Sequence, residues 1–197
     1  MTKFMKKLLR ILVLGLFLIT PSWADDIRDL AIEDMSIGDS MLDYFSEKKI
    51  RKGSEAIYPK SDKFFSVTFS FEDKFKFYDG VQFHYKKNDK KYMIHSITGQ
   101  IYYEDIQKCK KEMNKIVKEF SEMFPNTKKI EEGKREHTSE KGSFVYSTFF
   151  IFDSTDSVAV KCYDWSKKLN DGGMKDGLGV YISNREYNYF IVNEAYK

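Results

Sequence analysis

The stretch EDIQKCKKEMNKIVKEFSEMF, residues 104–124, carries the clearest secondary-structure signal in the chain. Its apolar residues recur every three or four positions, and lysines and glutamates fill most of the positions between them. Pro125-Asn126 follows and ends the pattern. The sequence therefore predicts one long amphipathic helix that packs an apolar face on the rest of the protein. The apolar positions are Ile106, Cys109, Met113, Ile116, Val117, Phe120, Met123 and Phe124.

Strand patterns flank this helix on both sides, and two tight turns separate them. Asn88-Asp89 predicts a hairpin before the helix, and residues 153–156 predict a turn after it. The charged segment 126–142 is predicted to be a loop. The strand signals are the alternating residues Phe65, Val67, Phe69 and Phe71, followed by stretches at about 75–86, 91–103, 144–152, 157–163 and 178–182.

Short helices are predicted near both ends of this region. Ser36 to Asp39 resembles a helix N-cap, so a helix is expected to continue to about Lys49. Ser183 to Glu186 is a similar signature that opens a C-terminal helix. Hairpin-linked strands interrupted by helices predict an α+β fold. We expect a mainly antiparallel sheet of about five or six strands, packed by a long central helix.

The first 24 residues, MTKFMKKLLRILVLGLFLITPSWA, predict a secretory signal peptide. Four basic residues precede an apolar run, and Ser22 and Ala24 supply the small residues of a cleavage site between Ala24 and Asp25. A retained membrane anchor is the alternative, but the apolar run is shorter than the roughly 20 residues that a bilayer requires. We expect residues 25–197 to form a single mature domain, periplasmic or secreted, without a membrane span.

The charge of the mature chain does not favour nucleic acid as a partner. The whole chain holds 33 basic and 30 acidic residues, and the first 24 residues hold four of the basic ones and no acidic one. The remainder therefore carries 29 basic and 30 acidic residues, a net charge of −1. A nucleic-acid-binding protein usually presents a clustered basic face. The expected partner is a protein or a small-molecule ligand.

The two cysteines, Cys109 and Cys162, predict a disulfide. An even number of cysteines in an exported chain is typical of a bridge. Cys109 lies on the apolar stripe of the long helix, and a turn centred on Ser154-Thr155 places Cys162 on a core-facing strand face, opposite Phe149 and Ile151. A buried reduced pair and a catalytic or metal-bound thiol are the alternatives, but no C-x-x-C spacing indicates a redox centre.

Two groups of residues are weak candidates for binding a metal. The hairpin places His84 and His95 on one face, but no third or fourth ligand is apparent, and partly buried hydrogen-bonding histidines are the favoured interpretation. His137 is expected to be solvated. The stretch from Asp164 to Asp176 contains Asn170, Asp171 and its two terminal aspartates beside glycines, but it lacks the spacing of a calcium-binding EF-hand loop. A turn-rich connection is favoured there, and no metal or other cofactor is assigned.

Aromatic residues concentrate between Phe144 and Phe152. Alternation would place four of them on the face away from the predicted core, so either helices cover both faces or an aromatic patch is exposed for a partner. Coverage by helices is the favoured interpretation. The chain has no G-x-S-x-G, S-x-x-K, H-E-x-x-H or glycine-rich phosphate loop, so no catalytic residue is assigned.

Three stretches resemble uncharacterised exported proteins of marine alphaproteobacteria whose genes are AT-rich. They are Ala24 to Phe45, Cys162 to Trp165 and Asn193 to Tyr196. That family has no assigned activity, so the resemblance implies export and nothing about a reaction. Met35 to Phe45 is also similar to the small lipoprotein of the outer-membrane barrel-assembly machinery, although this chain lacks a cysteine for lipid attachment.

The sequence favours an exported, non-enzymatic binding or envelope-associated module. An exported enzyme of unrecognised class and a structural partner of an outer-membrane assembly complex are the alternatives. Polar groups with perturbed protonation in one pocket would favour the enzyme. A large exposed apolar patch would favour the structural partner.

Overall fold

The computed structural model describes residues 26–138 and 140–197. The predicted signal peptide and its cleavage site between Ala24 and Asp25 lie outside these residues. The described chain forms the following helices, 3₁₀ turns (η) and strands: η1 Ile27–Asp29, β1 Ala31–Ile32, β2 Met35–Ser36, η2 Met41–Asp43, α2 Glu47–Gly53, β3 Ser54–Glu55, β4 Phe64–Ser70, β5 Gly80–Lys86, β6 Ser96–Tyr102, α3 Ile106–Met123, β7 Lys128–Glu136, β8 Phe144–Ile151, β9 Ser157–Asp164, α4 Lys167–Asp171, β10 Gly177–Ser183 and α5 Arg185–Asn193.

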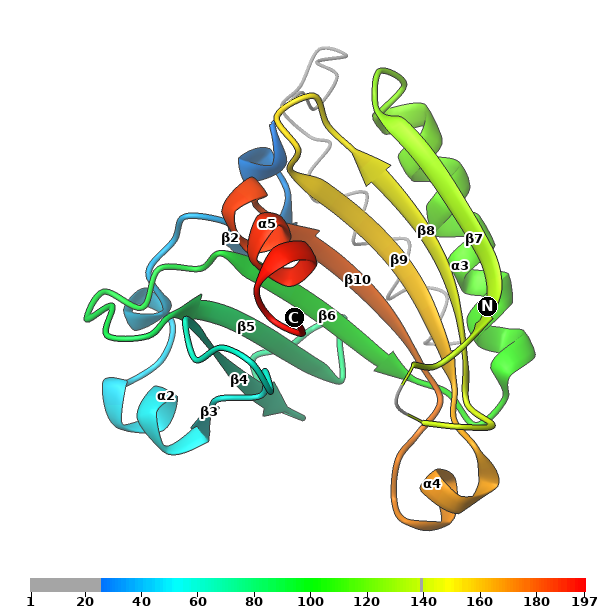
Figure 1. Ribbon diagram of the computed structural model, residues 1–197, viewed down its shortest axis with the longest axis horizontal. Coiled ribbons are helices and arrows are strands. Elements are labelled where there is room, and N and C mark those ends of the chain that lie inside the picture. The colour runs from blue at the N-terminus through cyan, green and yellow to red at the C-terminus, as the bar shows by residue number, and fades with distance from the viewer. Residues whose placement is uncertain (1–25, 139) are drawn as a thin grey trace.

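The described residues form an α+β fold around an eight-stranded antiparallel sheet. The strand order is β3-β4-β5-β6-β10-β9-β8-β7, and β1 and β2 form a separate two-stranded sheet. The sheet twists strongly, so that β4 and β5 run across the direction of β8 and β9 (Figure 1). The predicted fold class is confirmed in outline, but the expected five or six strands were too few.

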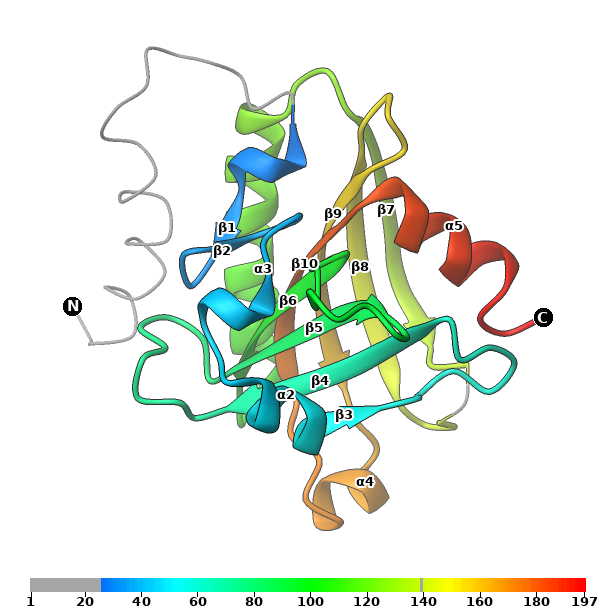
Figure 2. The same ribbon diagram turned by 90° about the vertical axis from the view of Figure 1, so that its left-hand side faces the viewer.

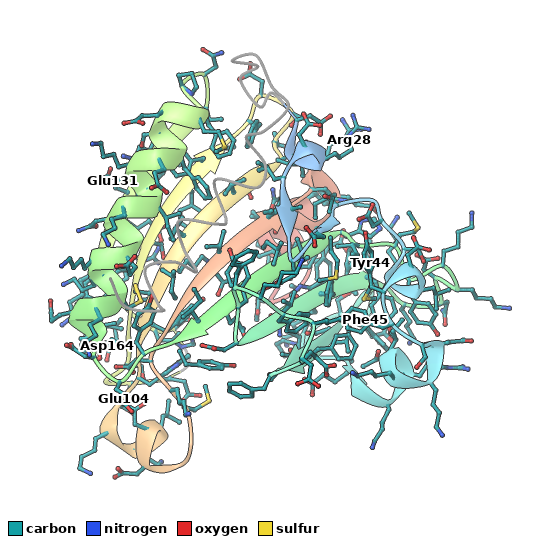
Figure 3. All side chains as sticks on the ribbon, turned by 180° about the vertical axis from the view of Figure 1, so that it is seen from behind. Arg28, Tyr44, Phe45, Glu104, Glu131 and Asp164 are labelled. Atoms are coloured by element: carbon teal, nitrogen blue, oxygen red, sulfur yellow. A yellow bond between two sulfur atoms is a disulfide. The ribbon has the colours of Figure 1, made fainter. Side chains whose placement is uncertain are left out.

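The main hydrophobic core lies on one face of this sheet. The long helix α3 packs on β9 and β10, and the N-terminal elements from η1 to α2 cover the other half of the same face (Figure 3). The helix is therefore one of two units that cover this face. The sequence predicts a central helix, but the position of α3 is not clearly central. Its inward residues Cys109, Met113 and Ile116 are buried, as its apolar spacing predicts.

The C-terminal helix α5 lies on the opposite face of the sheet from α3 (Figure 2). Its side chains Tyr187 and Phe190 form a second, smaller core with Phe64 of β4 and Tyr58. The predicted C-terminal helix is confirmed, although Asn184 rather than Ser183 caps its first turn.

The predicted disulfide between Cys109 and Cys162 is present. The two α-carbons lie 6.0 Å apart, and both residues are fully buried. The bridge joins the inner side of α3 to the core face of β9, two elements separated by 53 residues in sequence. It therefore ties the helix to the sheet at the position where the two pack together.

The register between β8 and β9 differs from the predicted one by a single residue. Cys162 pairs with Tyr146, and Val158 pairs with Phe150, so Phe149 lies on the opposite face. The loop between Ile151 and Ser157 has an odd number of residues, and Thr155 adopts a positive φ of 67°. Because side chains alternate along a strand, a shift of one residue exchanges the two faces. The face with Phe150 is therefore the core face.

Two further sequence predictions were wrong. The segment 126–142 contains β7, whose residues are mostly charged and exposed because it is the edge strand of the sheet. Charged edge strands lack the apolar alternation that indicates a strand. Near the N-terminus, Ser36 belongs to β2 and caps no helix. Its N–H does bind the Asp39 carboxylate, at 2.8 Å, but a 3₁₀ turn capped by Ser40 follows, and Ser46 caps the short helix α2.

Candidate functional site

A cleft of about 440 Å³ opens where the β4–β5 loop, the end of β6 and the α4–β10 loop meet. We call it the end cleft. Aromatic side chains and carboxylates line it together. Its lining residues are Phe71, Asp79, Tyr102, Tyr103, Glu104, Asn170, Met174, Lys175 and Asp176.

Phe71 is the most exposed large apolar residue in the described chain. Its side chain is 68% exposed, and its backbone has a φ of 54°, in the left-handed region that non-glycine residues rarely adopt. Its ring lies 5.9 Å from the ring of Tyr102 at the mouth of the end cleft. Residues in sparsely populated backbone conformations cluster at active sites and ligand clamps.

Asp79 fixes the near wall of the cleft. Its carbonyl oxygen accepts a hydrogen bond from the N–H of Phe71 at 2.6 Å, and its own N–H donates to the carbonyl of Gln100 at 2.8 Å. Its carboxylate accepts the N–H of Tyr102 at 2.9 Å. One residue thus joins the β4–β5 loop to β6 and holds a negative charge at a defined position.

The loop that carries Phe71 and Asp79 is anchored from the N-terminal region. The Glu33 carboxylate, in the β1–β2 turn, accepts three main-chain N–H groups of this loop, from Lys76, Phe77 and Tyr78, at 2.8, 2.6 and 2.8 Å. Hydrogen bonds to an ionised acceptor are stronger than neutral ones. The wall of the cleft is therefore positioned by a residue 46 positions before Asp79 in the sequence.

Asp176 fixes the far wall. Its carboxylate accepts the N–H of Trp165 at 2.9 Å, and its carbonyl accepts the N–H of Tyr103 at 2.8 Å. Burial raises the pKa of Asp164 above its ordinary value, and repulsion from the nearby Asp176 carboxylate raises it further. The lining as a whole holds three carboxylates and one lysine, so the cleft is negative.

The two candidate metal-binding histidines lie elsewhere, beneath α5. The His84 ring is 4.8 Å from the Tyr187 ring, and Nδ1 of His95 lies 3.0 Å from the side-chain amide nitrogen of Asn184. Burial lowers the pKa of His84 to about 3, which keeps its imidazole neutral. Within residues 26–138 and 140–197, no three His, Cys, Asp or Glu side chains are close enough together to hold a metal ion.

Three buried polar atoms around His84 have no hydrogen-bond partner in the described part of the chain. They are Ser66 Oγ on β4, His84 Nδ1 on β5 and Thr98 Oγ1 on β6. Ser66 and His84 are directly opposed in the sheet, and Ser96, the partner of His84 on β6, bonds to Ser183 at 2.8 Å. Unpaired buried polar groups are costly, so this row is a second feature that packing alone does not explain.

The other candidates from the sequence are His137 and the stretch from Asp164 to Asp176, and part of that stretch lies at the end cleft. His137 is half-buried with its ring 5.2 Å from that of Trp165, so the expectation of a solvated side chain was wrong. The stretch from Asp164 to Asp176 holds the short helix α4, and its Asn170 and Asp176 reach the end cleft.

The sequence carries no clear signal for most of the residues of the end cleft. Phe71 continues the alternation of Val67 and Phe69 in the sequence, but the strand β4 ends at Ser70. Asp79, Tyr102 and Glu104 carried no pattern. The glycines and acidic residues at 170–177 lie in the stretch for which the sequence favours a turn-rich connection over a calcium loop, and Asn170 and Asp176 of that stretch line the end cleft.

Comparison with known proteins adds no relative. No protein-family model matches the chain, and neither the curated proteins nor the solved structures contain a significant match. Among the described residues, no helix has both the length and the apolar character needed to cross a bilayer. The function must therefore be argued from the site itself.

Proposed function

We propose that this protein is an exported binding module and that the end cleft is its ligand site. The observation that carries this proposal is the exposed ring of Phe71, held at a positive φ beside Tyr102 on the rim of a cleft that also holds three carboxylates. Such a constellation has no role in the hydrophobic core, because Phe71 points into solvent. It does provide apolar contact area and fixed charges to a ligand.

The export part of the proposal rests on two observations. Residues 1–24 have the pattern of a signal peptide, and the one pair of cysteines is joined in a disulfide. Disulfides persist in oxidising compartments and are rare in the cytosol. We expect the native protein to begin at Asp25, which N-terminal sequencing of material from the native source would show. A native chain that retains Met1 would contradict the periplasmic or secreted location.

The binding part is tested by comparing ligand capture by matched variants. The immobilised mature protein is exposed to native envelope and medium extracts, and bound compounds are identified by mass spectrometry. Phe71→Ala combined with Met174→Ala empties the mouth of the cleft. Tyr189→Ala, which removes a 61% exposed aromatic ring from α5, is the control. We expect a compound that wild type and Tyr189→Ala retain and the cleft variant loses; identical capture by all three would refute the proposal.

One observation favours a second candidate, a structural partner in an envelope complex. The outer side of α5 and the tail after it expose Tyr189, Val192 and Tyr196, at 61, 66 and 61%. Tyr189 and Val192 are three positions apart and share one side of the helix. This candidate predicts the reverse outcome in the same experiment, with a protein retained by the cleft variant and lost from Tyr189→Ala.

A further inference from the structure

We infer that the ligand of the end cleft is a small organic cation, an amine or a guanidinium compound. This inference rests on the binding function proposed above and names the chemical class that the cleft selects. It follows from three separate properties of the lining: its charge, its aromatic surface and its size.

The charge of the lining favours a cation. Asp79, Glu104 and Asp176 contribute three negative charges, and Lys175 contributes one positive charge. Two of these carboxylates are held by main-chain N–H groups, of Tyr102 and Trp165, so they stay in place without a ligand. A cleft with low-dielectric walls concentrates ions of the opposite sign. An anionic ligand would meet net repulsion here.

The aromatic surface favours an organic cation over a bare ion. Phe71 and Tyr102 line the same cleft as the carboxylates, with Met174, which is 45% exposed, across the mouth. A cation near an aromatic face is attracted by the negative face of the ring, and alkyl groups attached to that cation bury apolar area against it. An alkyl amine or guanidine offers both contacts, whereas a hydrated metal ion offers neither.

The size of the cleft favours a small molecule. Its volume of about 440 Å³ lies within the range of small-molecule pockets, roughly 300–1,000 Å³. Asp79 comes from the β4–β5 loop and Glu104 from the connection between β6 and α3, whereas Asp176 comes from the α4–β10 loop, so the carboxylates are distributed over two walls. A ligand with two cationic ends separated by an alkyl chain could contact both walls at once.

The test uses probes of matched length and different charge. 1,4-Diaminobutane and agmatine are the cations, 1,4-butanediol is the neutral analogue and succinate is the anion. Binding to the mature, disulfide-bonded protein is followed by amide chemical shifts and calorimetry at low salt, with a chelator present. We expect the diamine and agmatine to shift the amides of residues 71, 79, 102–104 and 174–176. We also expect at least tenfold weaker binding of the diol and of succinate.

Two variants and a control locate the site. Glu104→Gln removes an exposed carboxylate for which no hydrogen bond is found in the described structure, and Phe71→Leu removes the ring but keeps an apolar side chain. Glu122→Gln removes a charge that is also exposed, near the far end of α3, 16 residues from its start. We expect diamine binding to be threefold to tenfold weaker in the first two variants and unchanged in the control. Added salt should weaken diamine binding to the wild-type protein.

The outcomes separate the ligand class from the binding function. The inference that the ligand is a cation would be wrong if the diol bound as tightly as the diamine. It would also be wrong if diamine binding were unchanged in both cleft variants. Binding of lysine-containing peptides without binding of either small cation would contradict the inferred class as well. In each of these cases the capture experiment still decides the binding function, because it uses no assumed ligand. If wild type and the cleft variant captured the same compounds, the proposed binding function itself would be refuted.

Discussion

The ring of Tyr78 lies directly against the α-carbon of Gly99, so close that a β-carbon on Gly99 would sit 2.5 Å from Cδ1 of the ring. Tyr78 is buried on the core face of β6, one residue before Asp79. Only glycine allows this approach. The contact seats the β4–β5 loop on the sheet and thereby places one wall of the end cleft.

Replacing Gly99 with Ala should destabilise the protein through this contact. Forcing extra atoms into a packed core typically costs about 1–3 kcal/mol. For a chain of this size we expect a fall in melting temperature of roughly 2–10 °C. The control is the same change in a Tyr78→Ala background, where the clash is gone and the added cost should be small. An undiminished cost in that background would show that the ring is not the cause.

The disulfide should contribute much of the stability. Closing a loop between residues 53 apart gives a chain-entropy estimate of about 4 kcal/mol, and measured values are often lower. Reduction should lower the melting temperature by several degrees or more. Cys109→Ser and Cys162→Ser should cost about the same, and the double variant should cost little more than either. Additive costs, or two free thiols on titration of the native protein, would contradict the bridge.

Glu33→Gln should loosen the β4–β5 loop without unfolding the protein. The amide of Gln is neutral, so the bonds from the N–H groups of Lys76, Phe77 and Tyr78 lose their charge assistance. Amide hydrogen exchange at these three positions should accelerate severalfold. Asp34→Asn is the control, because its exposed carboxylate pairs with the side chain of Lys76 and, among the described residues, accepts none of these N–H groups. Equal acceleration in both variants would mean that the exchange does not depend on Glu33.

Acid should destabilise the protein through His84. Burial against Tyr58 and Tyr187 lowers its pKa from 6.5 to about 3, so between these values the unfolded chain binds a proton that the folded chain does not. The His84 contribution is therefore present in full above pH 6.5 and falls as the pH drops toward 3, by at most about 1.4 kcal/mol per pH unit. His95, whose pKa burial also lowers despite the nearby Glu186, acts in the same direction.

Denaturant titrations at several pH values measure this effect. His84→Phe keeps an aromatic ring of similar size and should show a shallower fall in unfolding free energy between pH 6.5 and 4. A slope that His84→Phe leaves unaltered would place the acid sensitivity elsewhere.

Calcium should have no specific effect on stability. The stretch from Asp164 to Asp176 folds in part as the helix α4, and its Asp176 carboxylate already accepts the N–H of Trp165. Melting curves recorded with millimolar calcium and with a chelator should therefore overlie. A rise of several degrees with calcium, absent with magnesium, would instead indicate a dedicated calcium site in this loop.

Local sequence patterns predicted those features of the fold that depend on a single segment of the chain. The apolar spacing of residues 104–124 is enough to define α3, because one face of that helix must be buried whatever it packs on. The cysteine pairing also followed, since each cysteine lies on the apolar face of its own element. The register of β8 and β9 did not follow, because it depends on how the chain turns at Thr155.

The amino-acid sequence by itself determined the α+β class, the long helix and the two cysteines available for a bridge. Only the tertiary structure decided where the candidate site lies. Its residues come from the β4–β5 loop, from β6 and from the segment after α4, and they meet because Tyr78 fits over Gly99 and Glu33 binds the loop. The sequence of one segment does not predict such long-range contacts. Hydrogen bonds and close contacts between distant segments leave no periodic pattern in the sequence of either segment.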